Sequence, residues 1–166
     1  MMSRKSCQVM IKPTGSVCNL DCKNSIYLEK EKLYPQRKAN YRMSEDTLEL
    51  FIKQHIAAQD VDEVIFAWQG GEPTLMGLPF FRRAVELQQI YAGEKTIINT
   101  FQTNGILIDN EWAIFLSNTP SWWAFLLMVM PRYMMNGGLL VRVNQRMREL
   151  NGPLNAWYAT VWNLIR

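Results

Sequence analysis

Two cysteines and a serine near the start of the chain have the spacing of a metal site. Cys18 and Cys22 are separated by three residues, and Ser25 follows after two more. Three thiolates in the pattern C-x3-C-x2-C can bind three irons of a [4Fe-4S] cluster and leave the fourth iron open to another ligand. A serine hydroxyl is a hard, poorly acidic donor and a weak ligand for iron. The spacing therefore predicts cluster chemistry, and Ser25 predicts that this chemistry is impaired.

The cysteine count and the start of the chain favour a reducing compartment. The chain contains three Cys, the third being Cys7, and no apolar signal segment follows Met1. An odd count favours metal binding over disulfides. We therefore expect a cytoplasmic protein in which Cys7 is a small apolar residue. The apolar run from Trp122 to Met130 is too short to cross a bilayer, so no membrane partner is expected.

The composition divides the chain into two parts. With 166 residues and 48% hydrophobic content, the chain is long enough for one domain with a core. Acidic and basic residues are nearly balanced up to Ser117, whereas residues 118–166 hold five Arg, no Lys and a single acid, Glu149. We therefore divide the chain into a domain at residues 1–117 and a tail at residues 118–166. The arginines of the tail follow no patterned helix, so no nucleic-acid partner is expected.

The elements that must position the cysteines are predicted by the spacing of apolar residues up to Ser117. Extended runs predict strands at Val9–Ile11, Val61–Trp68 and Thr96–Phe101. Helical spacing predicts helices from the N-cap Ser44 to about Ala58, from Pro79 to Tyr91 before Gly93, and from Asn110 to Leu116. Strands that alternate with helices imply right-handed crossovers and a parallel sheet, so the predicted fold class is α/β.

Three loops follow the carboxyl ends of the predicted strands. They cover residues 13–27, 69–75 and 102–105. Ligands bind at this end of the sheet in α/β folds, so we expect the functional residues there. His55 lies beside the apolar stripe of its helix, and we expect it to have a structural role.

Motifs in these three loops occur in an order that identifies a family. They are Cys18-Asn-Leu-Asp-Cys22 with Tyr27-Leu-Glu-Lys, then Trp68-Gln-Gly-Gly-Glu-Pro-Thr-Leu75, then Phe101-Gln-Thr-Asn-Gly105. Together they closely resemble the N-terminal part of the anaerobic sulfatase-maturating enzymes, which are radical S-adenosylmethionine (SAM) proteins. The resemblance runs from about Val9 to Ser117. It implies that this part forms the N-terminal half of a partial (β/α)6 barrel.

The resemblance also implies an activity, cofactors and partners. Enzymes of this family oxidise a Cys or Ser side chain of a sulfatase polypeptide to formylglycine. A [4Fe-4S] cluster binds the amino and carboxylate groups of SAM, and an electron donor supplies the electron that cleaves SAM to a 5′-deoxyadenosyl radical. The radical removes hydrogen from the substrate carbon.

Site residues follow from the resemblance position by position. Cys18 and Cys22 correspond to metal ligands, and Ser25 occupies the third ligand position. Tyr27 and Gln69 correspond to positions near the target side chain. Gly70 and Gly71 would let the backbone approach SAM, while Glu72 and its neighbouring carbonyls would accept hydrogen bonds from the methionyl ammonium. The other expected cofactor-binding positions are Asn24, Pro73, Gln102, Thr103 and Asn104, of which the last three end the third strand and are expected to face the same cavity.

The chain departs from the family pattern in two places. Ser25 replaces the third Cys, and Asn24 stands where the family has an aromatic residue, so cluster retention is expected to be poor. The sequence after Ser117 does not resemble the family. Trp122-Trp123-Ala124 must encode Val-Gly when the frame moves by one base, and with permissive codons the neighbouring residues then read Phe-Leu-Val-Gly-Ile-Ser-Ile-Asp-Gly. We therefore expect a frame-shifted tail, absence of the fourth to sixth βα units, and an open sheet edge.

These departures leave alternatives open. The leading interpretation is a degenerate, inactive fragment of a radical SAM sulfatase maturase. An alternative is a non-catalytic interaction module that uses the exposed surface of the half-barrel. A zinc site at Cys18 and Cys22 is a third possibility, but two more ligands at suitable spacing are not visible.

Overall fold

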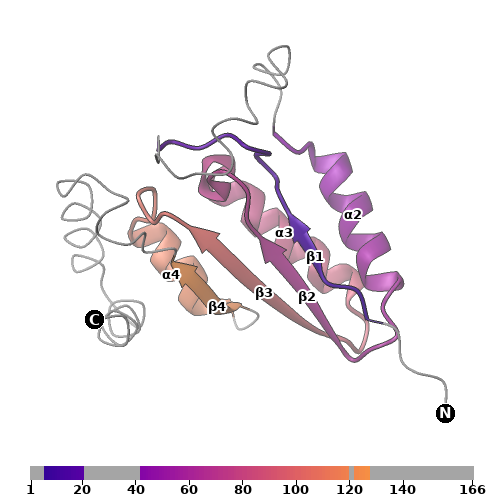
Figure 1. The fold of residues 1–166 in the computed structure, drawn as a ribbon. Helices are drawn as coiled ribbons and strands as arrows, with labels where there is room; N and C mark the ends of the chain where they lie inside the picture. The colour runs from indigo at the N-terminus through magenta and orange to yellow at the C-terminus, as the bar shows by residue number, and fades with distance from the viewer. Residues whose placement is uncertain (1–5, 21–41, 120–121, 128–166) are drawn as a thin grey trace.

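A parallel sheet with helices between its strands forms the part of the chain that the computed structural model describes, residues 6–20, 42–119 and 122–127. The strands lie in the order β1 (Val9–Ile11), β2 (Glu63–Trp68), β3 (Thr96–Thr103) and β4 (Trp122–Leu127). The connections contain α2 (Glu45–Ala57), the short 3-10 helix η2 (Pro73–Met76), α3 (Leu78–Tyr91) and α4 (Asn110–Asn118). All three strand pairs are parallel. The predicted α/β fold is confirmed (Figure 1).

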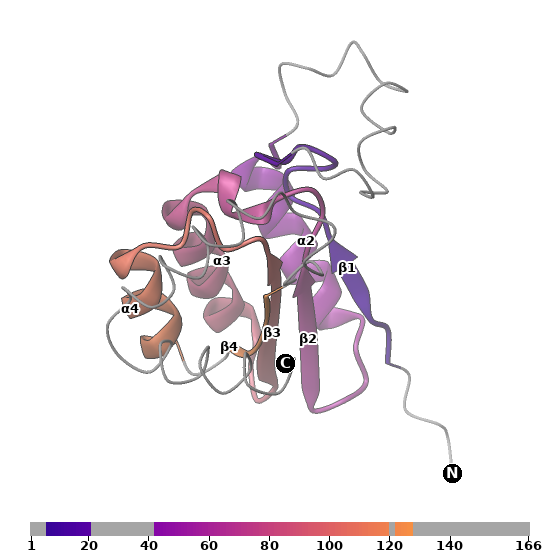
Figure 2. The same ribbon diagram turned by 60° about the vertical axis from the view of Figure 1, so that its left-hand side comes forward.

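The helices cover one face of the sheet (Figures 1 and 2). Side chains alternate between the two faces of a strand, and on β2 the buried set is Val64, Phe66 and Trp68. The ring of Phe81 on α3 lies edge-on between Trp68 and Phe101, with centroid distances of 5.5 and 4.9 Å. This aromatic contact joins α3 to the two central strands at the middle of the hydrophobic core.

No helix of the described part covers the opposite face of the sheet, as Figure 2 shows with the sheet nearly edge-on. Met10 on β1 belongs to this face and is 63% exposed. Ile65 and Ala67 on β2 and Ile98 on β3 are only half-buried. The described part is therefore a two-layer structure with its core on the helix side.

Buried polar side chains in this core are paired. The Asn99 Oδ1 atom accepts hydrogen bonds from Trp68 Nε1 at 2.7 Å and from Gln88 Nε2 at 2.9 Å, and Asn99 Nδ2 donates to Gln88 Oε1 at 2.8 Å. His55 is buried, with Nε2 3.1 Å from the carbonyl oxygen of Ile65. The structural role expected for His55 is confirmed.

Local sequence signals account for most element ends. Ser44 caps α2, because its hydroxyl accepts a hydrogen bond from Thr47 N at 3.2 Å. Pro79 lies in the first turn of α3, and Gly93 beyond its end has a φ of +58°. β3 continues to Thr103, two residues further than predicted. The prediction missed η2, whose first residue is Pro73.

The expectation that the fourth βα unit is wholly absent is wrong for its strand. β4 pairs with β3 from Asn99↔Trp122 to Thr103↔Leu127, with a register irregularity between Asn99 and Thr100. The aromatic and aliphatic run in β4 has a strong preference for extended structure, so it occupies the edge that β3 would otherwise expose. The expected properties of residues 128–166 lie outside the described residues.

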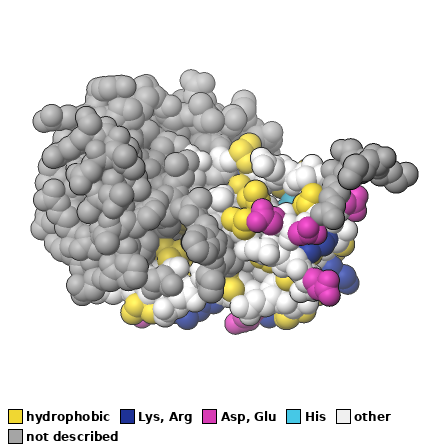
Figure 3. Space-filling view, turned by 90° about the horizontal axis from the view of Figure 1, so that it is seen from below, with side chains coloured by type: hydrophobic (Ala, Val, Ile, Leu, Met, Phe, Trp, Pro, Cys, Tyr) yellow, Lys and Arg dark blue, Asp and Glu magenta, His cyan; other side chains and the backbone are white. Residues whose placement is uncertain are grey.

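Acidic side chains lie at the end of the sheet where the strands begin. Asp60 and Glu63 are exposed there, and Figure 3, which views this end, shows acidic and hydrophobic side chains interspersed. Cys7 precedes β1 at the same end, where its backbone N–H donates to Gln59 Oε1 at 2.9 Å. It is exposed, so it does not pack as a small apolar residue.

None of the described helices combines the length and the apolar composition that a membrane span requires.

Candidate functional site

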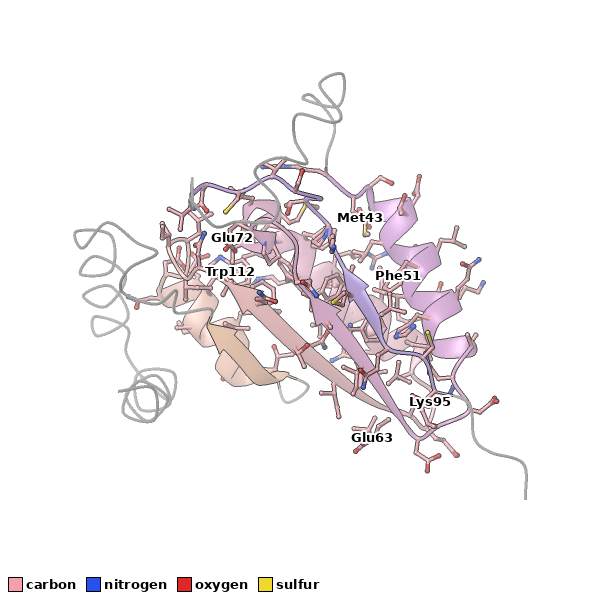
Figure 4. The ribbon with its side chains drawn as sticks, in the orientation of Figure 1. Met43, Phe51, Glu63, Glu72, Lys95 and Trp112 are labelled. Carbon is pink, nitrogen blue, oxygen red and sulfur yellow. The ribbon has the colours of Figure 1, made fainter. Side chains whose placement is uncertain are left out.

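The candidate site lies at the end of the sheet where the strands finish. Three described segments meet there, at residues 12–20 after β1, 69–72 after β2 and 103–105 at the end of β3. Glu72 is at this end, whereas Glu63 and Lys95 lie at the other (Figure 4). The three segments therefore meet at the carboxyl end of the sheet, where the loops after the three predicted strands were expected.

Backbone hydrogen bonds hold the first two segments side by side beyond the sheet. Gln69 N donates to the Ile11 carbonyl at 2.8 Å, Gly71 N to that of Gly15 at 3.0 Å, and Glu72 N to that of Val17 at 2.8 Å. These bonds extend the contact between β1 and β2 into the loops. The segment that leads to Cys18 is therefore fixed by the segment that contains the two glycines.

The two glycines make this contact possible. Gly70 has a φ of +124°, and a Cβ atom on it would lie 2.7 Å from the Gly15 carbonyl oxygen. A Cβ atom on Gly71 would overlap the Val17 carbonyl group. The expectation was that these glycines let the backbone approach SAM. In the structure, the glycines have another role: they leave room for the loop that leads to Cys18, which lies directly against their backbone.

The carboxylate of Glu72 is fully buried and accepts four hydrogen bonds. Its Oε1 atom accepts from Thr74 N at 2.9 Å, from Thr74 Oγ1 at 2.5 Å and from Thr103 Oγ1 at 2.7 Å. Its Oε2 atom accepts from Asn104 N at 2.7 Å. A carboxylate has about four lone-pair sites, and four donors of the chain occupy those of Glu72. Glu72 also serves as the N-cap of η2.

The end of β3 differs from the expectation in one respect. Gln102 and Thr103 are consecutive strand residues, so their side chains point to opposite faces. Thr103 is buried and donates to Glu72, while Gln102 is half-buried on the face without helices. The expectation that Gln102, Thr103 and Asn104 face one cavity is wrong for Thr103.

Cys18 is the described member of the expected ligand set. Its thiol is partly exposed and lies near the side chain of Asn104, with 3.8 Å between Asn104 Nδ2 and Cys18 Sγ. Four other predicted site residues, Cys22, Asn24, Ser25 and Tyr27, lie outside the described residues.

Sequence reasoning missed three residues of this site. The Thr14 hydroxyl donates to the Glu72 carbonyl at 3.3 Å, Thr74 contacts the Glu72 carboxylate, and Asn19 accepts from Asn104 Nδ2 at 2.8 Å. The Glu-Pro-Thr sequence was a usable signal for Thr74, because a capping side chain followed by Pro is typical of a helix start. No local pattern marks Thr14 or Asn19, since their partners are far away in the sequence.

The chemistry of the donor set decides how well a [4Fe-4S] cluster fits. The described residues contain no group of three His, Cys, Asp or Glu side chains placed to hold a metal ion. Cys18 supplies a soft sulfur donor at the candidate site, and Cys22 is a second such donor by type. The hydroxyl of Ser25 is not. The donor set therefore fits the cluster at two of its three positions.

Comparison with known proteins points to one group of relatives. The chain is 45% identical over 111 residues to a serine-type anaerobic sulfatase-maturating enzyme of Bacteroides thetaiotaomicron, and 44% identical over 107 residues to one of Klebsiella pneumoniae. It is 42% identical over 112 residues to a cysteine-type anaerobic sulfatase-maturating enzyme of Clostridium perfringens. These matches cover 63 to 67% of the chain but only 26 to 29% of each relative. The chain thus spans about a quarter of the length of these relatives. No protein-family model matches it.

Solved structures agree with the sequence comparison. The fold matches a structure of native anSMEcpe with bound AdoMet and a peptide, with a TM-score of 0.68 and 32% sequence identity. It also matches native anSMEcpe with bound AdoMet, with a TM-score of 0.66. The first match covers 85% of this chain and 40% of the other.

Proposed function

Because the N-terminal two thirds of this chain is related in sequence and fold to the anaerobic sulfatase-maturating enzymes, we propose that it derives from a radical SAM enzyme that oxidises a sulfatase Cys or Ser to formylglycine. The observation that carries the proposal is that one residue from each of the three motifs meets the others at one end of the sheet. Glu72 binds the backbone of Asn104, and Asn104 contacts Cys18.

In this proposal the end of the sheet supplies distinct subsites. Cys18 and Cys22 would hold the [4Fe-4S] cluster, with Ser25 at the third position. Gln69 and Tyr27 would lie near the sulfatase side chain. The positions proposed to bind SAM are Asn24, Gly70, Gly71, Pro73, Gln102, Asn104 and the backbone carbonyls beside Glu72, since the Glu72 carboxylate and the Thr103 hydroxyl are bonded to each other.

A bound cluster would pass to SAM the electron that the electron donor supplies. The described residues contribute a rigid support instead of reactive groups. Glu72 and Thr103 are buried and bonded to each other, so they hold the ends of β2 and β3 together. The glycines bring the Cys18 loop against this support. A sulfatase polypeptide and an electron donor are the partners that the proposed activity requires.

We propose further that this copy is inactive because of Ser25. A hydroxyl does not replace a soft thiolate as an iron ligand, so the cluster would be held by too few donors. Loss of the cluster would remove the group that cleaves SAM.

A reconstitution series tests the inactivity proposal. The chain is treated anaerobically with iron and sulfide, and cluster content is measured by visible absorbance and by iron and sulfide analysis. We expect low loading for the wild type and for the matched control Ser25→Ala, and higher loading for Ser25→Cys. Equal and full loading of the wild type and Ser25→Cys would contradict the proposal, because it would show that the serine is tolerated.

We also propose that the sequence after Ser117 is translated out of frame. β4 is compatible with this proposal, because a strand needs only the local preference of the Trp122–Leu127 run for extended structure and the neighbouring edge of β3. The nucleotide sequence around codon 117 tests it. Restoration of the family's sequence by a one-base change supports the proposal, and an intact frame without such a restoration contradicts it.

A further inference from the structure

The side chain of Gln59 holds the segment before β1 against the end of α2. Gln59 Oε1 accepts from Cys7 N at 2.9 Å, and Gln59 Nε2 donates to the Cys7 carbonyl at 3.0 Å. The side-chain amide thus pairs with both backbone groups of Cys7, as a neighbouring strand would. We call this pair of bonds the Cys7 latch. It fixes the chain just before β1 begins at Val9.

The latch decides how Gln59 and His55 share their hydrogens. A backbone N–H can only donate, so the Gln59 atom that faces Cys7 N is the oxygen. The NH2 group then reaches His55, with 3.3 Å between Gln59 Nε2 and His55 Nδ1. His55 Nε2 lies 3.1 Å from the Ile65 carbonyl, which can only accept, so Nε2 carries the hydrogen and Nδ1 accepts from Gln59. Neutral His55 and the closed latch therefore satisfy each other.

A second proton on the imidazole is incompatible with this arrangement. Nδ1 becomes a donor and faces the NH2 group of Gln59. Reversal of the Gln59 amide would satisfy Nδ1, but it would oppose NH2 to the Cys7 N–H and oxygen to the Cys7 carbonyl. His55 is 6% exposed, and its ring stacks on Phe51 at 5.5 Å and meets Phe66 edge-on at 4.9 Å. Turning the ring to solvent would break this packing, so the latch is the contact that yields.

The charged groups around His55 come from three neighbouring segments. Lys95 donates to the carbonyls of Ile56 at 2.7 Å and Gln59 at 2.6 Å. The end of the helix, which would otherwise favour an imidazolium, therefore already binds a cation. The Cys7 thiol is exposed. Exposed acidic side chains follow α2 and begin β2, and they are Asp60, Asp62 and Glu63. Figure 4 shows Glu63 and Lys95 at this end of the sheet. Solvent screens exposed charges, whereas the mismatch at Nδ1 is buried.

We propose that His55 makes the Cys7 latch sensitive to acid, so that a proton on Nδ1 releases the segment before β1 from α2. The latch is complete while the imidazole is neutral. It is lost as the pH falls through the range in which imidazoles gain a proton, at about pH 6.5 for a free side chain. The opening equilibrium rises by about 5- to 150-fold, which corresponds to the cost of one unpaired buried donor. This inference does not depend on the proposed function.

The test is hydrogen exchange of the Cys7 amide in the full chain labelled with ¹⁵N. The observed rate is divided by the rate expected for an unstructured chain at the same pH, which gives a protection factor. Between about pH 7.5 and 4.5, a range that brackets imidazole titration, we expect protection of Cys7 to fall by about 5- to 150-fold. Constant protection would overturn the proposal.

His55→Gln is the matched control. Its amide can donate to the Ile65 carbonyl and accept from Gln59, but it does not titrate. We expect protection of the Cys7 amide in this variant to stay constant over the same range, even if its level differs from that of the wild type. The same loss in acid would overturn the proposal, because another group would then be responsible.

Gln59→Glu should reverse the sign of the effect. A carboxylate at this position can accept both from Cys7 N and from a protonated Nδ1, so a proton on His55 strengthens the contact. We expect protection of Cys7 to rise as the pH falls to about 5, below which carboxylates begin to gain protons. A fall like that of the wild type would contradict the proposed link between His55 and the latch.

The wild-type chain gives a further readout that needs no variant to fold. His55 is the single histidine of the sequence, so its ring ¹⁵N resonances are identified directly. At about pH 7.5 their shifts should place the hydrogen on Nε2. A hydrogen on Nδ1 would overturn the proposal, because Gln59 would then already face a donor in the closed latch.

Discussion

The side chain of Glu72 has no exposed surface, and its neighbours explain how the fold accommodates it. Burial of a carboxylate is unfavourable unless donors replace water, and here four donors come from two threonines and the backbone of Asn104. The residue type suggested a ligand contact from sequence alone. Sequence did not indicate the burial, because two of the four donors belong to Thr103 and Asn104 at the end of β3 and are identified only once β2 and β3 are placed together.

The substitution Glu72→Gln tests this structural role. The glutamine oxygen can still accept from Thr74 and Thr103, but the new NH2 group faces the N–H of Asn104, and two donors then oppose each other. We expect a loss of about 1 to 3 kcal/mol in the free energy of unfolding, measured by urea denaturation. A variant as stable as the wild type would indicate that the carboxylate is not bonded as described.

At the scale of elements, side chains on the outer surface join α2 to α3. Arg83 on α3 donates to Glu45 on α2 at 2.7 Å, and the Tyr91 hydroxyl donates to Glu49 at 2.6 Å. The hydrogen bonds to Glu45 and Glu86 raise the pKa of Arg83. The hydrogen bond to Glu49, followed by desolvation, raises the pKa of Tyr91 above its usual 10.0.

A pH dependence of stability follows from Tyr91. Its pKa is higher in the folded chain than in the unfolded chain, so folding favours the neutral phenol. The contribution is complete below the unfolded pKa of about 10 and is lost as the pH rises through the folded pKa. We expect Tyr91→Phe to be less stable than the wild type at neutral pH, with a difference that disappears in strong alkali. Urea denaturation of both chains across this range measures it, and a constant difference would contradict the assignment.

The sequence predicted regular elements better than it predicted their irregular connections. β1 has the predicted bounds, and α2 begins after Ser44 as predicted, because apolar spacing and a capping side chain are local signals. The turn at Pro73–Met76 is short and capped locally by Glu72, whereas the pairing of the Gly15 and Gly71 loops depends on partners far apart in the chain. Such contacts leave no periodic pattern in the sequence.

At the scale of the whole molecule, the described sheet has one covered face and one face without helices. Met10 and Ile11 are neighbours on β1 with opposite orientations, at 63% and 3% exposure. We expect Met10→Ala to change the free energy of unfolding by less than about 0.5 kcal/mol. Ile11→Ala should lower it by about 2 to 5 kcal/mol through the cavity that it leaves. Urea denaturation of the pair provides the measurement, and equal losses would mean that both faces are packed.

The edge of the sheet is where whole-molecule reasoning from the sequence failed. Composition indicated a break after Ser117, and the motifs resembled the family only up to that point. The run at Trp122–Leu127 nonetheless has a strand-forming sequence, and β3 offers it an unpaired edge. A strand forms where the local sequence favours extended structure and a neighbouring strand has an unpaired edge. Strand formation therefore depends less on ancestry than the choice of residues in a functional site does.

The order β1-β2-β3-β4 in space repeats the order along the chain. Each strand that leaves the ribosome therefore finds the neighbour it pairs with already synthesised, and no early strand must wait for a late one to be inserted beside it. Growth of this sheet can follow translation one βα unit at a time, from the N-terminal side onward. If synthesis stopped after any βα unit, the strands already made could still form every pairing that they have with one another in the finished sheet.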